Sequence, residues 1–185
     1  MREEKAALRR RLRELRPDEA AAVQQSSSIC THLRSWRVLS QAGCIAAYMP
    51  LRHEADITPF LQAWLAAGKT LLLPRVNGRN MTFHTVTRLD MLMRGSYGVL
   101  EPPKDAEQVP LARAEVILVP LEAVDAAGHR LGKGGGYYDR ALPGTSGYRL
   151  GVALQYQVIA RVPVESGDVS LDGWVDPEGI HNKAK

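Results

Sequence analysis

The chain has 185 residues, enough for one domain with a substantial core and too few for two full domains. Apolar residues make up 45% of the sequence and charged residues 24%, so the disordered and fibrous classes are excluded. The net charge is +4, but the first sixteen residues alone carry seven basic and three acidic side chains. This leaves 17 of the 24 basic and 17 of the 20 acidic residues for the remainder, which is neutral and does not predict a basic nucleic-acid-binding face.

The first sixteen residues predict an amphipathic helix. Leu8, Leu12 and Leu15 follow the i, i+4, i+7 spacing of an apolar helix face. Lys5 and Arg9 fall on a stripe beside that face, and such a stripe can hold phosphates or carboxylates in a cleft. An ordinary solvated face is the alternative, and the pattern alone favours it. The other basic residues of the stripe are Arg2, Arg13 and Arg16.

The rest of the chain alternates predicted strands and helices. A strand, a helix and a second strand within about thirty residues form a βαβ unit, which predicts parallel pairing. The elements, in chain order, are a helix starting at Pro17–Glu19, a strand Cys44–Met49, a helix between Asp56 and Gly68, strands Thr70–Leu73 and Met81–Val86, a long connection over 87–110, and strands Glu115–Pro120 and Tyr148–Leu154. We therefore predict one α/β domain spanning 1–185, with a mostly parallel central sheet flanked by helices in a three-layer α/β/α, Rossmann-like arrangement.

No stretch approaches the roughly 20 apolar residues of a membrane span, and no apolar segment follows the charged N-terminus. Cys30 and Cys44 belong to no CxxC pair and cannot build a disulfide framework. The five histidines show no metal-ligand spacing, so a transition-metal site is not predicted. We expect a cytoplasmic, reduced protein that binds neither membrane nor nucleic acid and is a monomer.

A glycine-rich segment carries the clearest functional signal. Four glycines fall within residues 132–136, and consecutive amides without Cβ atoms can form an anion nest. Arg130 and Lys133 supply cations beside it, so the segment predicts phosphate binding; a flexible glycine hinge is the alternative. It is not a Walker A loop, because Gly134 follows Gly-Lys where Ser or Thr should hold the metal, and Tyr137 breaks the Gly-x-Gly-x-x-Gly pattern.

The run from Asp125 to Arg140, preceded by Val119-Pro120, closely resembles the signature of the 5-formyltetrahydrofolate cyclo-ligases, also called methenyltetrahydrofolate synthetases. The resemblance spans almost the whole chain. Its further points are the N-terminal Lys5 and Arg9, Glu54, the turn with Gly98, Glu101 and Pro102, and Val162-Pro163-Val164 before Asp172. Glu122 and Val124 depart from the residues common in the family before Asp-x-x-Gly, but leave the glycines intact.

The resemblance implies that MgATP drives closure of the formyl group of 5-formyltetrahydrofolate onto nitrogen-10 of the folate. The products are 5,10-methenyltetrahydrofolate, ADP and phosphate, and an activated iminium phosphate is formed on the way. Phosphoryl transfer needs mainly positioning and charge neutralisation, which glycine amides, cations and Mg²⁺ can provide. The substrate is a small molecule, with or without a polyglutamate tail.

The resemblance also assigns residues. For ATP it implies Lys5, Ala6, Ala7, Leu8, Arg9, Arg130, Leu131, Gly132, Lys133, Gly134, Gly135, Gly136, Tyr137 and Tyr138. For the folate it implies Arg9, Met49, Glu54, Tyr97 and Tyr137, although a methionine at a strand end is commonly a core residue. For Mg²⁺ it implies Asp139 and Asp172, for which a helix-start carboxylate and an Asp-Gly turn are the structural alternatives.

Two other functions compete with this hypothesis. A nucleic-acid-binding protein using the basic N-terminal helix would bind in a strongly salt-dependent way. An α/β enzyme acting on sugar phosphates would fill the glycine nest with a single phosphate and would not need ATP.

Overall fold

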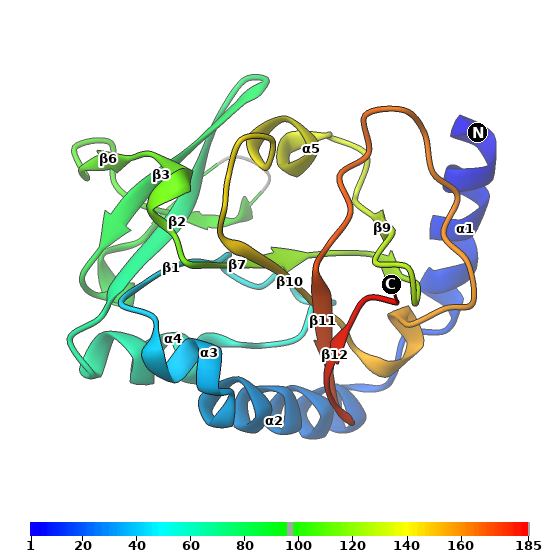
Figure 1. Ribbon diagram of the computed structural model, residues 1–185, viewed down its shortest axis with the longest axis horizontal. Coiled ribbons are helices and arrows are strands. Elements are labelled where there is room, and N and C mark those ends of the chain that lie inside the picture. Colours follow the sequence, from blue (N-terminus) through cyan, green and yellow to red (C-terminus); the bar gives the residue numbers. More distant parts are fainter. Residues whose placement is uncertain (96–97, 185) are drawn as a thin grey trace.

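Residues 1–95 and 98–184 are described by the computed structural model, which is built around an eight-stranded sheet of order β12-β11-β10-β7-β1-β2-β3-β6 (Figure 1). The strands are β1 Cys44–Ala46, β2 Thr70–Asn77, β3 Asn80–Val86, β4 Met93–Arg94, β5 Leu100–Glu101, β6 Gln108–Val109, β7 Val116–Pro120, β8 Ala123–Val124, β9 Arg130–Leu131, β10 Tyr148–Val152, β11 Gly173–Asp176 and β12 Gly179–Asn182. The helices are α1 Arg2–Glu14, α2 Glu19–Ser35, α3 Arg37–Gln41, α4 Thr58–Ala66 and α5 Tyr137–Ala141, with 3-10 turns η1 Leu89–Met91, η3 Leu111–Arg113 and η4 Gln155–Gln157.

The centre of the sheet is parallel, as predicted. The contiguous strands β11, β10, β7, β1 and β2 pair in parallel, whereas β12, β3 and β6 add antiparallel edges. The predicted βαβ unit is confirmed, since α4 connects the parallel neighbours β1 and β2. Two small separate hairpins, β4-β5 and β8-β9, complete the strands of the described residues.

The apolar strand sequences follow from burial on both faces of the sheet. Ile45, Leu71 and Leu118 pack into the core under α2, α3 and α4. Their neighbours along the strands, such as Leu72 and Ile117, pack into a second core on the opposite face. A strand buried on both sides is apolar at successive positions, which is the pattern that the sequence shows.

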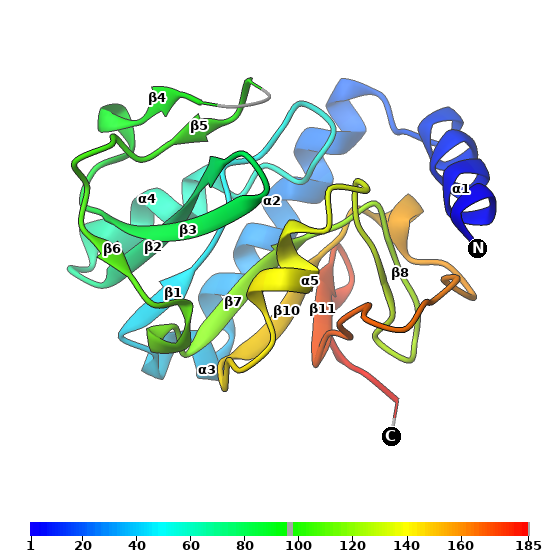
Figure 2. The same cartoon turned by 90° about the horizontal axis from the view of Figure 1, so that it is seen from above.

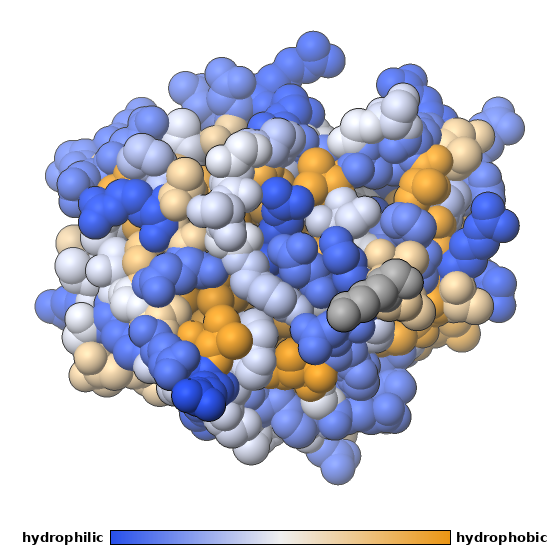
Figure 3. Space-filling model, in the orientation of Figure 1, coloured by the Kyte–Doolittle hydropathy of each residue, from blue (hydrophilic) through white to orange (hydrophobic). Residues whose placement is uncertain are grey.

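The two faces are covered unequally. Helices α2, α3 and α4 lie on one side of the sheet and the short α5 on the other (Figure 1). Figure 2 shows α5 in front of β7 and β10, with irregular chain around it. The three-layer arrangement is therefore present, but much of its second layer is loop and 3-10 turn rather than helix. On the face drawn in Figure 3, hydrophobic residues form small groups separated by hydrophilic ones.

Helix α1 lies at one end of the molecule, beside the β8-β9 hairpin (Figure 2). Leu12 is fully buried there with Ala123, Leu131 and Val162, and Leu8 packs against the same cluster. Leu15 was predicted on this face but is 52% exposed, because it is the residue at which the helix ends. No helix among the described residues combines the length and apolar character that a membrane span requires.

The structure differs from the prediction at several strand ends and in the long connection, and β10 ends at Val152 rather than Leu154. Strand β1 ends at Ala46 rather than Met49, and β2 continues through Pro74 to Asn77 to form a hairpin with β3. Pro74 is tolerated because β1 pairs with β2 only as far as Leu72, so a proline without an N–H interrupts no ladder with β1. The predicted connection over 87–110 contains η1 and the short strands β4, β5 and β6 among its described residues.

Candidate active site

A cleft of about 810 Å³ opens where the parallel strands β1, β2 and β7 end. Tyr48 and Met49 follow β1, Pro74 lies late in β2, and Pro120 ends β7. In open α/β sheets, ligands bind outside the carboxyl ends of the strands at the point where connections leave in opposite directions. Strand β1 is such a point. On one side it pairs with β2, the next strand along the chain, and on the other side with β7, which the chain reaches only after several further strands.

Helix α1 supplies one wall of the cleft. Lys5 and Arg9 line it, as expected for residues four apart on one helix face. Lys5 is 9% exposed, and its Nζ donates to Oδ2 of Asp168 at 2.5 Å and lies 3.5 Å from Oε2 of Glu165. Arg9 Nε donates to the Gly132 carbonyl at 2.8 Å. The helix is therefore joined to both the glycine segment and the C-terminal part of the chain.

The carboxylate of Asp168 is held ionised by this contact. Burial alone would raise the pKa of Asp168, but the hydrogen bonds from Lys5 and from the Glu165 amide outweigh it and lower the pKa. Asp168 and Glu165 both line the cleft. The cleft thus contains a buried cation next to a carboxylate that stays charged at neutral pH.

The glycine segment forms the facing wall. Gly134 and Gly136 have φ of +102° and +64°, values that L side chains rarely adopt. A Cβ at Gly135 would lie 2.7 Å from the ring of Tyr137. These three positions accept only glycine without strain, and they leave main-chain atoms bare on the cleft surface, as an anion nest requires.

A nearly buried ion pair stands beside the glycines. Arg130 Nη2 donates to Oδ1 of Asp139 at 2.7 Å, with the two side chains 4% and 27% exposed. The guanidinium also lies 5.7 Å from the ring centre of Tyr138. Its Nε is buried without a hydrogen-bond partner among the described residues. Because a buried guanidinium needs compensation, Asp139 is the main group that stabilises Arg130 here.

Glu54 stands where the glycine segment meets the loop after β1. Its Oε1 lies 2.6 Å from Nζ of Lys133, and its Oε2 accepts the amide of Leu51 at 2.8 Å. The Glu54 amide in turn donates to the Leu51 carbonyl at 2.9 Å, so a tight turn orients the carboxylate. Glu54 is only 8% exposed, whereas Lys133 is 43% exposed and free to contact another anion.

Tyr48 and Tyr138 add two cleft-lining phenols. Each hydroxyl is buried and has no hydrogen-bond partner among the described residues. Burial raises the pKa of both phenols well above the ordinary value, and the charge of Glu54 raises it further. Both hydroxyls therefore stay protonated and can donate a hydrogen bond to a ligand.

The cleft gathers most of the side chains that the sequence nominated. Those that line it are Lys5, Arg9, Met49, Glu54, Arg130, Leu131, Gly132, Lys133, Gly134, Gly135, Gly136, Tyr137, Tyr138 and Asp139. Tyr97 lies outside the described residues. Ala6, Ala7 and Leu8 do not line the cleft, because they follow Lys5 around the helix, and Leu8 packs into the core beneath α1.

The structure does not bring Asp172 to the cleft beside Asp139, so the prediction of these two as a ligand pair is corrected. Asp172 Oδ2 accepts the amide of Arg149, and Oδ1 lies 3.7 Å from Nζ of Lys183. One oxygen of Asp172 therefore contacts the start of β10, and the other lies near Lys183 close to the end of the chain. Asp168, four residues before Asp172, does line the cleft with Asp139, as do Glu54, Glu101 and Glu165.

Sequence reasoning missed Asp168, Glu165 and Tyr48, whereas Arg2, which also lines the cleft, belongs to the basic stripe that the sequence predicted. The pair Glu165 and Asp168 offered a signal, since two carboxylates on a polar turn could complement the basic stripe of α1. Among the described residues there is no group of three or more His, Cys, Asp or Glu side chains that could hold a metal ion by themselves. A cation bound here would take its other ligands from water or a bound anion.

Comparison with known proteins gives a consistent result. A model of the 5-formyltetrahydrofolate cyclo-ligase family matches residues 1–177. The 5-formyltetrahydrofolate cyclo-ligase of Escherichia coli is 30% identical over 180 residues, covering 94% of this chain and 98% of that protein. The NMR structure of Aquifex aeolicus 5,10-methenyltetrahydrofolate synthetase is 31% identical with a TM-score of 0.88, covering 98% of this chain and 93% of that one. The Mycoplasma pneumoniae 5,10-methenyltetrahydrofolate synthetase is 20% identical, has a TM-score of 0.76, covers 94% of this chain and 98% of that one, and shares the fold.

Proposed function

Because the chain belongs to the 5-formyltetrahydrofolate cyclo-ligase family, we propose that its cleft binds ATP and 5-formyltetrahydrofolate side by side. The activity is ATP-dependent cyclisation of 5-formyltetrahydrofolate to 5,10-methenyltetrahydrofolate with release of ADP and phosphate, a ligase reaction of folate one-carbon metabolism. The observation that carries the assignment of this site is that the basic face of α1 and the glycine segment line one cleft that also contains Glu54. Neither alternative function, nucleic-acid binding or sugar-phosphate chemistry, finds support among the relatives.

The triphosphate would lie between α1 and the glycine segment. Bare amides of residues 132–136 can donate to phosphate oxygens, and Lys5, Arg9 and Lys133 are cations on the same surface. Lys133 is half-exposed and stands beside Glu54, so it can contact both the nucleotide and the folate. The side chains of Ala6, Ala7 and Leu8 have no part in this arrangement.

Mg²⁺ would be held by Asp139 and Asp168 together with phosphate oxygens. Asp139 accepts from Arg130 and the Val169 amide through Oδ1, and Asp168 accepts through Oδ2. Among the described residues this leaves Oδ2 of Asp139 and Oδ1 of Asp168 without hydrogen bonds, which fits a hard cation that takes one or two carboxylates plus phosphates. When bound, the ion neutralises charge on the transferred phosphoryl group. Asp172 is not part of this proposal.

The folate would occupy the apolar end of the cleft, near Tyr48, Met49 and Glu54. Further residues of this end are Leu51, Pro74, Val76, Met81 and Val99. Glu54 is oriented by its own turn and can accept a hydrogen bond from a pterin N–H, while the Tyr48 hydroxyl can donate one. Tyr137 also lines the cleft and could contact either ligand.

In this proposed arrangement the two reactants would lie next to each other, as the reaction requires. The formyl oxygen is a poor leaving group, so it first attacks the γ-phosphorus of ATP and ADP departs. Nitrogen-10 then attacks the activated formyl carbon and loses its proton, and the carbon–oxygen bond breaks to release phosphate. Positioning and charge neutralisation supply most of the rate enhancement in phosphoryl transfer, and the cations of the cleft serve both.

An absorbance assay tests the proposal. Purified protein with MgATP should convert 5-formyltetrahydrofolate to the methenyl form, with one ADP formed per folate closed. Absence of conversion by a folded protein would refute it. Asp168→Asn should raise the Mg²⁺ concentration needed for half-maximal rate, and Asp172→Asn should leave it unchanged; the reverse result would restore Asp172 as ligand. That the protein is a cytoplasmic monomer accepting polyglutamylated folate is also a proposal.

A further inference from the structure

Glu101, at the end of β5, is a buried carboxylate in the part of the cleft that is otherwise apolar. It is 3% exposed and lines the cleft together with Pro74, Val76, Met81 and Val99. Burial of a carboxylate is unfavourable unless cations or hydrogen-bond donors compensate for its lost hydration. The partners of Glu101 therefore indicate whether the protein alone satisfies it or whether a ligand contributes.

The protein compensates this carboxylate only weakly. Oε1 accepts the Val76 amide at 3.3 Å, and Oε2 accepts no hydrogen bond from the described residues. No cationic side chain among these residues lies within 4 Å of either oxygen. Arg75, next to Val76 on β2, donates instead to the Pro102 carbonyl. With respect to the described part of the chain, Oε2 and one lone pair of Oε1 are thus available to donors from a ligand.

The main chain at Gly95 holds the carboxylate in place. The Gly95 amide donates to the Val99 carbonyl at 2.8 Å, which closes the chain over β5. A Cβ at this position would lie 2.1 Å from Cδ and 2.2 Å from Oε2 of Glu101, so any side chain here would displace the carboxylate. Glu101 is therefore fixed between Gly95 and the Val76 amide, and a fixed acceptor loses little freedom when a ligand binds.

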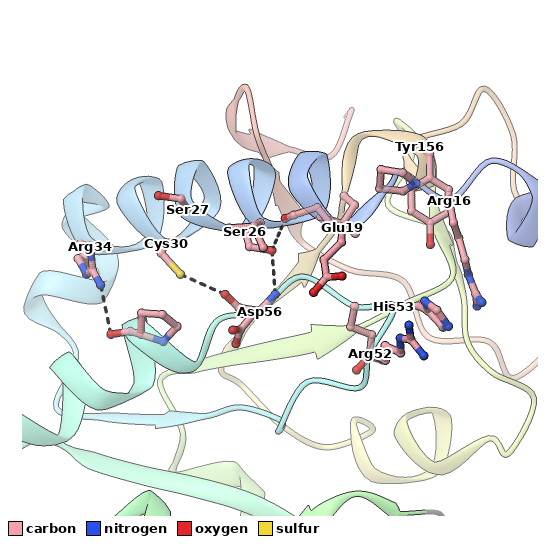
Figure 4. Close-up of a pocket in the computed structure, with 16 residues that line it drawn as sticks. Arg16, Glu19, Ser26, Ser27, Cys30, Arg34, Arg52, His53, Asp56 and Tyr156 are labelled. Atoms are coloured by element: carbon pink, nitrogen blue, oxygen red, sulfur yellow. Dashed lines mark hydrogen bonds between the residues drawn. The ribbon is translucent and has the colours of Figure 1, made fainter.

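Glu54, the other carboxylate near this end of the cleft, is already compensated. Its two oxygens are paired with Lys133 and with a main-chain amide. Glu54 also lines a second cavity, of about 440 Å³, between α2 and the loop that follows β1, where Arg52 is a further cation (Figure 4). Cationic side chains therefore lie near Glu54, whereas apolar side chains surround Glu101. Of the two carboxylates, Glu101 has the greater need of donors from a ligand.

We propose that Glu101 determines specificity for the pterin ring by accepting hydrogen bonds from its 2-amino group and from the neighbouring nitrogen-3. This rests on the proposed function, in which the folate occupies this end of the cleft. The two donors lie side by side on one edge of the ring and match the two oxygens of a carboxylate. The apolar side chains around Glu101 exclude water, which strengthens both hydrogen bonds. The opposite edge, with the formylated nitrogen-5, is then directed toward Glu54 and the phosphates.

The test compares 5-formyltetrahydrofolate with its 2-desamino-2-methyl analogue, in which a methyl group replaces one of the two donors. Dissociation constants are measured by calorimetry without ATP, so that turnover does not enter the result. The unmodified protein should bind the analogue about 10- to 100-fold more weakly, because a hydrogen bond to a buried carboxylate is lost and an oxygen of Glu101 stays unpaired. Equal affinities for the two folates would overturn the proposal.

Glu101→Gln is the decisive variant. The Val76 amide keeps the glutamine oxygen at the position of Oε1, which turns the side-chain NH2 group toward the pterin donors. The variant should bind 5-formyltetrahydrofolate at least about tenfold more weakly, and its affinities for the two folates should lie within about threefold of each other. Gly95→Ala should reduce the discrimination in the same way, because its Cβ displaces the carboxylate without removing it. The KM for ATP should not change in either variant.

Glu54→Gln is the matched control, since it makes the same substitution at the other carboxylate near this end. It should weaken folate binding or turnover but keep the preference for 5-formyltetrahydrofolate over the analogue. A folded Glu101→Gln variant that retains this preference refutes the proposal, and its loss in Glu54→Gln instead would assign the pterin contact to Glu54. If the unmodified protein neither binds nor converts 5-formyltetrahydrofolate, it is the proposed function that fails.

Discussion

Replacing Asp139 with alanine should destabilise the protein as well as impair its reaction. The Arg130 side chain is 4% exposed, and its remaining interactions are a 3.5 Å hydrogen bond to the Pro120 carbonyl, the ring of Tyr138 and the more distant charge of Asp168. Leaving a buried guanidinium without its carboxylate costs about 3–5 kcal/mol. Because Asp139 is 27% exposed and water can replace part of the contact, we expect about 2–3 kcal/mol.

The loss is measurable by thermal or urea unfolding. For a chain of this length, about 2–3 kcal/mol corresponds to a fall in Tm of about 4–12 °C. A double-mutant cycle isolates the pair: in an Arg130→Met background, Asp139→Ala should cost less than about 1 kcal/mol, because no buried cation remains to be compensated. Equal costs in the two backgrounds would refute the reasoning. The unfolding is measured without Mg²⁺ or ATP, so a role in metal binding does not enter the result.

Three further predictions concern the cleft and the pH dependence of stability. Lys5→Met should raise the KM for ATP about tenfold or more, because one charge-assisted phosphate contact is lost; an unchanged KM would reject the role of Lys5 in binding the nucleotide. Gly134→Ala should also raise the KM for ATP, because φ of +102° disfavours any side chain at this position of the cleft. Gly144→Ala is the control. It introduces similar backbone strain, at φ of +80° with open space around it, but lies outside the cleft and should leave that KM unchanged. Burial would raise the pKa of Asp125, but hydrogen bonds from the Val162 amide and from His129 outweigh it, so the folded pKa lies below the unfolded value of about 3.9. The ionised carboxylate of Asp125 contributes its full stabilisation above that value, and the contribution is lost as pH falls through the lower folded pKa. In Asp125→Asn the free energy of unfolding should therefore decrease less steeply as the pH is lowered into the acid range. A decrease as steep as that of the unmodified protein would contradict this.

Local spacing in the sequence predicted the parts of the site that are close together along the chain. Lys5 and Arg9 share a helix face because they are four residues apart. A cluster of glycines indicates a segment with exposed amides or positive φ angles, and the structure has both at residues 134–136. The parallel sheet followed from apolar runs alternating with helical segments. Together with the family resemblance, these features were sufficient to nominate most of the side chains that line the cleft.

Contacts between distant segments could not be predicted in this way. Lys5 meets Asp168 across 163 positions, and no periodicity relates the two. The sequence also does not show which of Asp168 and Asp172 faces the cleft. In the structure Asp172 accepts the Arg149 amide at the start of β10, and Asp168 lines the cleft. The second cavity depends on how α2 packs over the loop after β1.

The sequence by itself therefore determined the main helices and core strands and the chemical groups that each presents, because helix periodicity, apolar runs and glycine conformations are properties of neighbouring residues. The short elements, such as β8, β9, β11, β12 and α5, were not predicted from it. The tertiary structure alone decided which carboxylate faces which cation, since that depends on strand order and on the docking of α1 against a hairpin more than a hundred residues away. Charges are arranged by the packing of the apolar core, and their own pattern along the chain does not specify their partners.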